Sequence, residues 1–325
     1  MDKITFPIFE TKKNQIVDLN GGKSYFYELV PPDLCQKSSR EIDNFIDAVG
    51  SRLNIFDEDG FFKFYWLGGK SYLNTNYQDV HLPETDFIPC KSALELFFGS
   101  SDIFSDVGIH DDYISLNGNY KRVLSVLEFC GDEIDVNFLP KNVDYILSFQ
   151  KKAKDKALSK LERIRNSHLS SFLKPKRDIE SEGAYQQAEG LIGDLTNGFE
   201  SLFKIELYFL VSAFSLDDLN QKTISFIENC RSRGIKLFIE GQSFRKLKTG
   251  LATIFSELIP GVRPFLSIRQ HTDKTSHLKY LLPLHKSHLM DEGISLLDEE
   301  GKSIFFDPFS SEVRNRNMLV TGSSG

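Results

Sequence analysis

The chain has 325 residues, of which 40% are hydrophobic and 26% are charged, and this composition is typical of a globular protein with a sizeable core. A formal net charge of −7 argues against a dedicated nucleic-acid binder. The sequence has no long uncharged apolar run, and its first residues lack the pattern of a signal peptide. We therefore expect a cytoplasmic protein without a membrane span, whose four widely spaced cysteines are reduced.

Residues 1–140 predict a mixed α/β N-terminal domain, because short strand-like and helix-like patterns alternate along them. A helix is expected over 38–53, since Ser38 or Ser39 can cap it and apolar residues recur there at helical spacing. Runs of β-branched and aromatic residues predict strands at 24–30, 61–67, 113–116, 122–129 and 134–138.

A long helical pair is predicted at the start of a second domain, which we place at residues 141–285. The first helix is expected from Asn142 to about Leu173, because apolar residues step by three or four along it. The second is expected from Ile179 to about Phe203, after a break at Pro175. A short loop between two helices favours an antiparallel pair.

The first of these helices carries the one strongly basic stretch of an acidic chain. Two interpretations remain open. The basic residues can form a solvated helix face. They can also contact an anionic surface, either the lipid headgroups of an inner membrane or an acidic partner. The candidate contact residues are Lys151, Lys152, Lys156, Lys160 and Arg163.

Residues 204–260 predict a β-α-β-α layer of the half-wound or ferredoxin-like kind. Ser215 is placed to cap the first helix, and Gly234 follows its end. The expected elements are a strand at 204–214, a helix at 216–233, a strand at 235–240 and a helix at 243–258.

The last segment, 286–325, predicts a β-hairpin followed by a short buried strand. The hairpin strands are expected at Ile294–Leu297 and Ser303–Phe306, and the buried strand at Met318–Val320. That strand leads into small residues of the kind whose backbone N–H groups surround phosphates, namely Gly322, Ser323, Ser324 and Gly325. A P-loop then needs Gly, Lys and Ser or Thr, so we expect the chain to stop inside that loop. A Gly/Ser linker is the alternative.

The ordered string over 293–325 resembles the entry into the motor domain of conjugative-transfer and type IV secretion ATPases of the TraC/TrbE/VirB type. In that family a strand pair with Phe-Phe-Asp leads through Asn-x-Asn-Met-x-Val-x-Gly-x-Ser-Gly into the Walker A loop. In this chain Asn315-Arg-Asn-Met318 stands in the corresponding place. Upstream, the layer that ends at Ile259-Pro260 resembles the family in its element order.

The resemblance implies an α+β fold, in which the sheet domain, the helical pair and the β-α-β-α layer precede the hairpin and first strand of a RecA-like P-loop domain. It also implies a region that docks the motor on the cytoplasmic face of the inner membrane and contacts other type IV secretion inner-membrane subunits. The complete protein would self-associate as a hexamer and use ATP and Mg²⁺. This chain alone, without the Walker lysine and the Walker B acid, is expected to be inactive.

Two other functions remain open from the sequence. The first is a stand-alone protein-interaction module with a terminal linker. The second is the N-terminal module of another P-loop DNA translocase, which binding of single-stranded DNA would favour. The sequence shows no nucleophile–base pair, and the nearby histidines His285 and His288 have no cysteine to complete a zinc site. We therefore predict no catalytic and no metal site in this chain.

Overall fold

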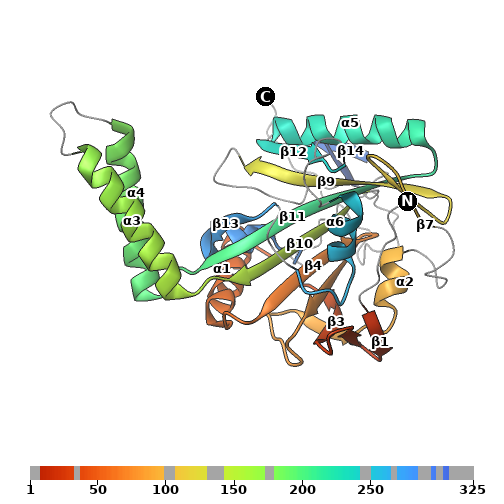
Figure 1. Cartoon of the computed structure of the whole chain (residues 1–325), viewed down its shortest axis with the longest axis horizontal. Helices are drawn as coiled ribbons and strands as arrows, with labels where there is room; N and C mark the ends of the chain where they lie inside the picture. Colours follow the sequence, from red (N-terminus) through yellow and green to blue (C-terminus); the bar gives the residue numbers. More distant parts are fainter. Residues whose placement is uncertain are drawn as a thin grey trace, which may run out of the picture.

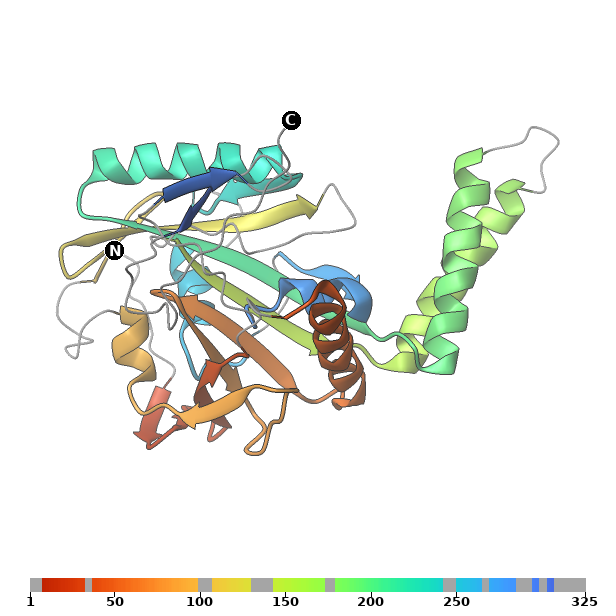
Figure 2. The ribbon, with the colours of Figure 1, turned by 180° about the vertical axis from the view of Figure 1, so that it is seen from behind.

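A single large antiparallel sheet organises the computed structural model, which describes residues 8–32, 37–98, 107–129, 143–172, 179–241, 250–264, 269–284, 294–297 and 303–306. Helices cover both faces of the sheet, and a pair of helices projects from one end of it as an arm (Figures 1 and 2). The predicted α+β class is confirmed in these residues.

Ten strands follow one another across the sheet, and all the strand pairs among the described residues are antiparallel. Their order is β1 (Ile8–Lys12), β2 (Gln15–Asp18), β3 (Lys23–Val30), β5 (Lys70–Thr75), β4 (Phe61–Leu67), β10 (Val143–Lys151), β11 (Leu202–Ala213), β9 (Asn119–Phe129), β8 (Ile114–Leu116) and β7 (Val107–Ile109). Three short strands pair alongside: β6 (Asp86–Pro89) on β3, β12 (Ile235–Ile239) on β9 and β13 (His271–Lys274) on β11. Because β10 lies between β4 and β11, strands from both sides of residue 140 share the sheet.

Two hydrophobic cores lie on the two faces of the sheet, because successive strand side chains point to opposite faces. On β11, Phe203, Ile205 and Phe209 enter the first core, while Tyr208 and Leu210 enter the second. The first core is closed by α1 (Ser39–Ile55), α5 (Leu216–Ser232), α7 (Thr275–Leu278) and the 3₁₀ turn η1 (Lys279–Leu281). The second is closed by α2 (Ala93–Phe98) and α6 (Leu251–Leu258).

The helix caps that the sequence predicted are present. Ser38 and Glu41 form a capping box at the start of α1, in which the Ser38 hydroxyl accepts from the Glu41 N–H and the Glu41 carboxylate accepts from the Ser38 N–H. The Ser215 hydroxyl accepts from the Asp218 N–H at 3.2 Å at the start of α5. Strands β11 and β12, joined by α5, pair on either side of β9. The predicted strand–helix–strand unit therefore exists as a split β-α-β unit.

The predicted helix from Asn142 to Leu173 is wrong over its first part. Residues Val143–Lys151 form the central strand β10, and the helix α3 spans only Lys154–Phe172. Ile146 and Phe149 fit helical spacing, but they face the two opposite cores, since β10 is buried on both sides. A strand that is buried on both faces reads as a nearly continuous apolar run, and so its period of two is lost.

The antiparallel helical pair itself is confirmed, with α4 spanning Ile179–Asn197 rather than reaching Phe203. Strand β11 takes over at Leu202. The pair is inserted between the hairpin partners β10 and β11, whose last paired residues are Lys151 and Phe203. The arm therefore grows out of the tip of a central β-hairpin (Figure 1).

The turn after α6 is fixed to the sheet by buried polar side chains. The fully buried Lys63 ammonium donates to the carbonyl oxygens of Glu257, Ile259 and Val262 at 2.5, 3.3 and 2.8 Å. The Tyr65 hydroxyl donates to the Leu258 carbonyl at 3.0 Å. These bonds satisfy carbonyl groups at the end of the helix that have no partner within it.

The predicted hairpin after residue 293 is present with the expected bounds. Strand β14 (Ile294–Leu297) pairs antiparallel with β15 (Ser303–Phe306), and Ile294 lies opposite Phe306. Other predicted features lie outside the described residues: the strand at 134–138, the first part of the helix at 243–258 and the strand at 318–320. The RecA-like start of a motor domain thus stays a prediction.

Candidate functional site

The predicted phosphate loop of Gly322, Ser323, Ser324 and Gly325 lies outside the described residues, as do His285 and His288. Within the described part of the chain, no group of three or more His, Cys, Asp or Glu side chains is arranged to hold a metal ion. The predicted basic contact residues lie within the described part of the chain, at or near the base of the arm.

The base of the arm is firmly attached to the sheet and to α1. The Lys152 N–H donates to the Leu202 carbonyl at 2.8 Å, which extends the β10–β11 ladder by one bond. The Asn54 side chain at the end of α1 donates to the Phe199 carbonyl at 3.0 Å. Ala157 and Leu195 pack with Leu202 in a small core of their own. These contacts fix the first turn of α3 relative to the strand ends.

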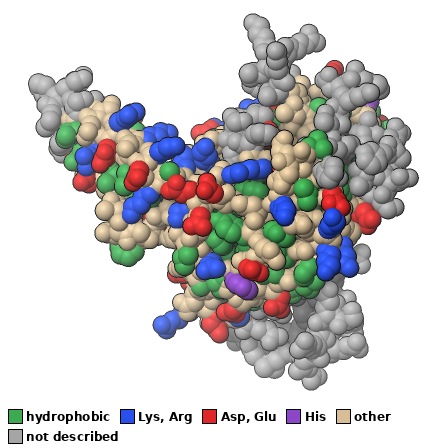
Figure 3. Space-filling view, turned by 60° about the horizontal axis from the view of Figure 1, so that its bottom comes forward, with side chains coloured by type: hydrophobic (Ala, Val, Ile, Leu, Met, Phe, Trp, Pro, Cys, Tyr) green, Lys and Arg blue, Asp and Glu red, His purple; other side chains and the backbone are tan. Residues whose placement is uncertain are grey.

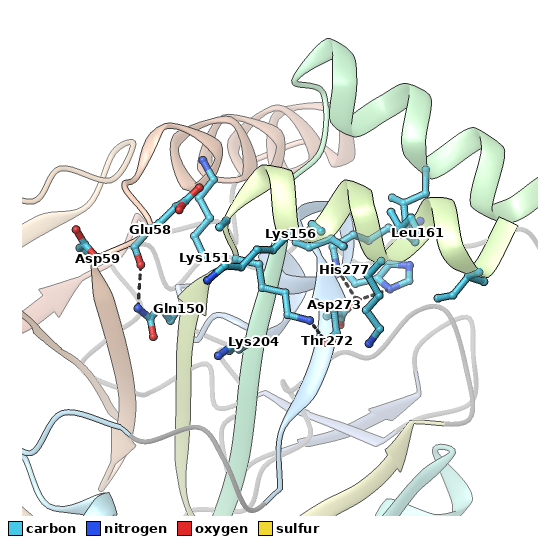
Figure 4. A pocket seen from close by; sticks show the side chains of 18 residues that line it. Glu58, Asp59, Gln150, Lys151, Lys156, Leu161, Lys204, Thr272, Asp273 and His277 are labelled. Carbon is cyan, nitrogen blue, oxygen red and sulfur yellow. Dashed lines mark hydrogen bonds and ion pairs between the residues drawn. The ribbon is translucent and has the colours of Figure 1, made fainter. Parts of the chain in front are cut away.

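A cavity of about 640 Å³ opens where the arm meets the sheet (Figure 4). Its walls come from the ends of β10 and β11, the first three turns of α3, β13 and the loop after α1. We call it the lysine groove, after the six lysines that line it: Lys151, Lys152, Lys156, Lys160, Lys204 and Lys274.

Positive charge is in excess in the lysine groove. Its six lysines face three carboxylates, those of Glu58, Asp59 and Asp273, which leaves a net charge of +3 with His277 neutral. This is opposite in sign to the whole chain. In Figure 3 the Lys and Arg side chains follow the arm onto the body of the molecule. The groove is therefore a local anion-attracting site in an acidic protein.

Two of the six ammonium groups have partners that carry no charge. Lys151 donates to the Asn54 carbonyl at 2.6 Å, and Lys152 donates to the Thr272 hydroxyl at 2.7 Å. The other four, Lys156, Lys160, Lys204 and Lys274, make no side-chain hydrogen bond or ion pair with another described residue. Among the described residues, these four ammonium groups thus have no direct counter-charge.

Neighbouring lysines also lower the pKa of Lys152. Burial lowers the pKa of Lys152, and the nearby ammonium groups of Lys160 and Lys204 lower it further. Burial likewise lowers the pKa of Lys151, with a smaller opposing effect from the Glu58 carboxylate. Both directions mean that the protonated side chains are less stable here than in water. An anion bound between them would relieve that repulsion.

The opposite wall of the groove carries a fixed acid–histidine pair. His277 on α7 and Asp273 on β13 lie 3.0 Å apart, Nδ1 to Oδ1. On the neighbouring side, the Glu58 carboxylate accepts from the Lys154 N–H at 3.1 Å, and the Glu58 carbonyl accepts from Gln150 at 2.8 Å. Asp273 and Glu58 are therefore held by the protein's own groups at the edge of the groove.

The floor of the groove toward the arm is apolar. It is made by side chains of α3 and α4 that pack only partly against each other, together with the start of β11, and its members are Ala157, Leu161, Ile164, Leu191 and Leu202. Ile164 remains 38% exposed. A charged rim beside an apolar floor suits a ligand with an anionic group attached to an apolar body.

A second cluster of ionisable groups lies in the described core, and its members form hydrogen bonds and ion pairs with one another. Arg269 donates to the Glu240 carboxylate at 2.7 Å, and its guanidinium lies 4.5 Å from the centre of the Phe238 ring. The Glu206 carboxylate accepts from the Arg269 N–H at 3.1 Å and from the Tyr208 hydroxyl at 3.2 Å. We interpret this cluster as structural, because it joins β9, β11, β12 and the approach to β13.

The predicted basic contact residues divide between the groove and its surroundings. Lys151, Lys152, Lys156 and Lys160 line the groove, whereas Arg163 does not. The sequence did not point to Lys204, Lys274 and Thr272, which arrive from β11 and β13. No local sequence pattern predicts that these residues line the groove, because their position there depends on which strands pair next to the arm.

None of the described helices is both long and apolar enough to cross a membrane. The chain matches no protein-family model and no curated protein.

Proposed function

We propose that this chain is the N-terminal docking region of an ATPase that powers conjugative DNA transfer or type IV secretion. The observation that carries the proposal is the sequence of features along 293–325, in which the hairpin of Ile294–Leu297 and Ser303–Phe306 precedes the Asn315–Met318 string and the glycines at 322 and 325. This order resembles the one that leads into the Walker A loop of the TraC/TrbE/VirB-type ATPases.

In this proposal the sheet is the rigid body of the docking region and the arm is its contact element. The arm projects from the body (Figure 2), and the basic residues from Lys151 to Arg163 line its base. They would hold the protein against the anionic cytoplasmic face of the inner membrane, next to other secretion subunits. Each Lys or Arg close to such a surface contributes about 1 kcal/mol. In the complete protein, self-association would arrange the motors into a ring, with ATP and Mg²⁺ as their cofactors.

Vesicle flotation tests the docking role. We expect the chain to float with vesicles that contain an acidic phospholipid, and the triple variant Lys152→Glu, Lys156→Glu and Lys160→Glu to remain in the unbound fraction. A control variant, Lys23→Glu with Lys91→Glu, reverses two exposed charges away from the arm and should float like the wild type, and the double variant Lys156→Glu with Lys160→Glu provides the comparison at equal charge. Equal flotation of the triple variant and the wild type would remove the basis for membrane docking through the arm.

A stand-alone interaction module is the second candidate, and exposed apolar side chains beside α5 favour it. Phe214 is 83% exposed and Ile224 is 59% exposed, and neither contributes to the two cores. Exposed apolar groups of this size occur at protein–protein contacts. Under this alternative the chain would bind its partner in the absence of any motor domain.

A further inference from the structure

The lysine groove has the shape of a small-molecule binding site as well as a positive charge. Its volume of about 640 Å³ falls within the range of about 300–1,000 Å³ that is usual for small-molecule sites. A flat basic surface would attract a membrane or a polyanion without such a cavity. The groove is also lined from six separate elements, namely β10, α3, α4, β11, β13 and α7, so its geometry is set by the fold rather than by one helix face.

Within the groove, Lys152, Lys160 and Lys204 line the same cavity from three different elements. Lys152, at the end of β10, is close enough to Lys160 on α3 and Lys204 on β11 for both to disfavour its protonated form. The Thr272 hydroxyl lies beside them and already accepts from Lys152 at 2.7 Å. Three cations and a hydroxyl in one cavity can supply donors to the several oxygens of a phosphate group.

We propose that the lysine groove binds a phosphate ester, with the phosphate held between Lys152, Lys160 and Lys204. The organic part of the ester lies on the apolar floor of Leu161, Ile164 and Leu191. A nucleotide and an acidic phospholipid are two kinds of molecule that combine a phosphate with such a body. The proposal concerns the chemistry that these two share, and it does not depend on the assignment to an ATPase family.

The repulsion among the lysines supports this assignment. Placing three like charges together costs stability in the empty protein, and the fold provides no carboxylate among the described residues to pair Lys160 or Lys204. Binding sites commonly hold such unfavourable arrangements because the ligand removes them. Neutralising Lys152 and Lys204 should therefore leave the free protein as stable as the wild type, or more so.

Calorimetric titration of the full chain tests the proposal with three soluble probes: inorganic phosphate, adenosine monophosphate and a short-chain phosphatidic acid below its micelle concentration. We expect saturable binding of at least one ester, roughly tenfold tighter than inorganic phosphate, since the apolar floor adds contact area. The affinity should fall as potassium chloride is raised. The tighter of the two esters identifies the source of the phosphate.

Paired variants locate the binding. Lys152→Gln with Lys204→Gln should weaken the ester roughly tenfold or more, because each charge-assisted hydrogen bond is lost. Lys23→Gln with Lys91→Gln removes the same charge elsewhere and should leave the affinity unchanged. Ile164→Asn should reduce the advantage of the ester over inorganic phosphate without changing the affinity for phosphate itself.

Three results would overturn the proposal. They are no saturable binding of either ester, equal weakening by the two double variants, and inorganic phosphate that binds as tightly as both esters. Because the probes are soluble, a wild-type chain that binds an ester but does not float with acidic vesicles would count against membrane docking and leave the proposed phosphate site unaffected.

Discussion

At the scale of single residues, Lys63 shows what a local sequence pattern can predict and what it cannot. The aromatic run at 61–67 predicted strand β4 correctly. It gave no sign that Lys63 in its middle is fully buried, because the carbonyls that bind its ammonium come from residues near 260. Burial lowers the pKa of Lys63 to about 7, against the opposing effect of Glu257 and Glu206.

Replacing Lys63 with Met should destabilise the protein by roughly 2–4 kcal/mol, because the buried carbonyl groups of Glu257 and Val262 lose the donor that Lys63 supplies. Urea unfolding followed by circular dichroism measures the change. Lys70→Met on the neighbouring strand β5 is the control. Lys70 pairs with Glu28 at the surface, so its loss should cost no more than about 1 kcal/mol. Equal stability of the two variants would contradict the role that we assign to Lys63.

Glu257 should make the stability depend on pH. Burial and the Glu206 carboxylate raise the pKa of Glu257 from 4.5 to about 7, although Lys63 opposes them. Between these two pH values the folded protein keeps a proton that the unfolded chain releases. The contribution of Glu257 to stability is therefore complete below about pH 4.5 and is lost as the pH rises toward 7.

The comparison with Glu257→Gln isolates this effect, since Gln does not titrate. The free energy of unfolding of the wild type, relative to the variant, should fall by roughly 1–2 kcal/mol across that window, after allowance for solvent screening. Above pH 7 the difference should level off. A difference that stays constant from pH 4.5 to 7 would show that Glu257 titrates in the same way in both states.

At the scale of elements, the boundaries set by caps and turns were predictable, and the boundary set by burial was not. The capping residues Ser38 and Ser215 and the hairpin strands 294–297 and 303–306 were all placed correctly. The error at 143–151 arose because β10 is buried on both faces, which hides the period of a strand. Local signals specify where an element begins, whereas its type can depend on its neighbours.

The arm should be removable. The ends of β10 and β11 already pair at Lys151 and Phe203, so a turn of about four residues in place of 153–200 would close an ordinary hairpin. The arm adds only a small core around Ala157 and Leu195. We expect cooperative unfolding to persist, with a loss of no more than about 3 kcal/mol. Near-ultraviolet circular dichroism measures the retained packing, and a non-cooperative transition would contradict this view of the arm.

At the scale of the whole molecule, the order of the strands in the sheet could not be predicted from the sequence. Long-range pairs such as β4 with β10 and β9 with β12 join segments that no local pattern connects. The lysine groove depends on the same pairing, because β11 and β13 bring Lys204 and Lys274 beside the arm. The basic stretch on α3 was visible in the sequence, and the cavity into which it opens was not.

ATP hydrolysis by the protein translated from the whole reading frame tests whether this chain serves a conjugative-transfer or type IV secretion motor, as we propose. We expect one further residue after Gly325, then Gly-Lys-Ser or Gly-Lys-Thr, and hydrolysis that requires Mg²⁺ and is lost when that lysine is replaced by Ala. A reading frame without this lysine, or a protein with it that hydrolyses no ATP, would contradict the claim.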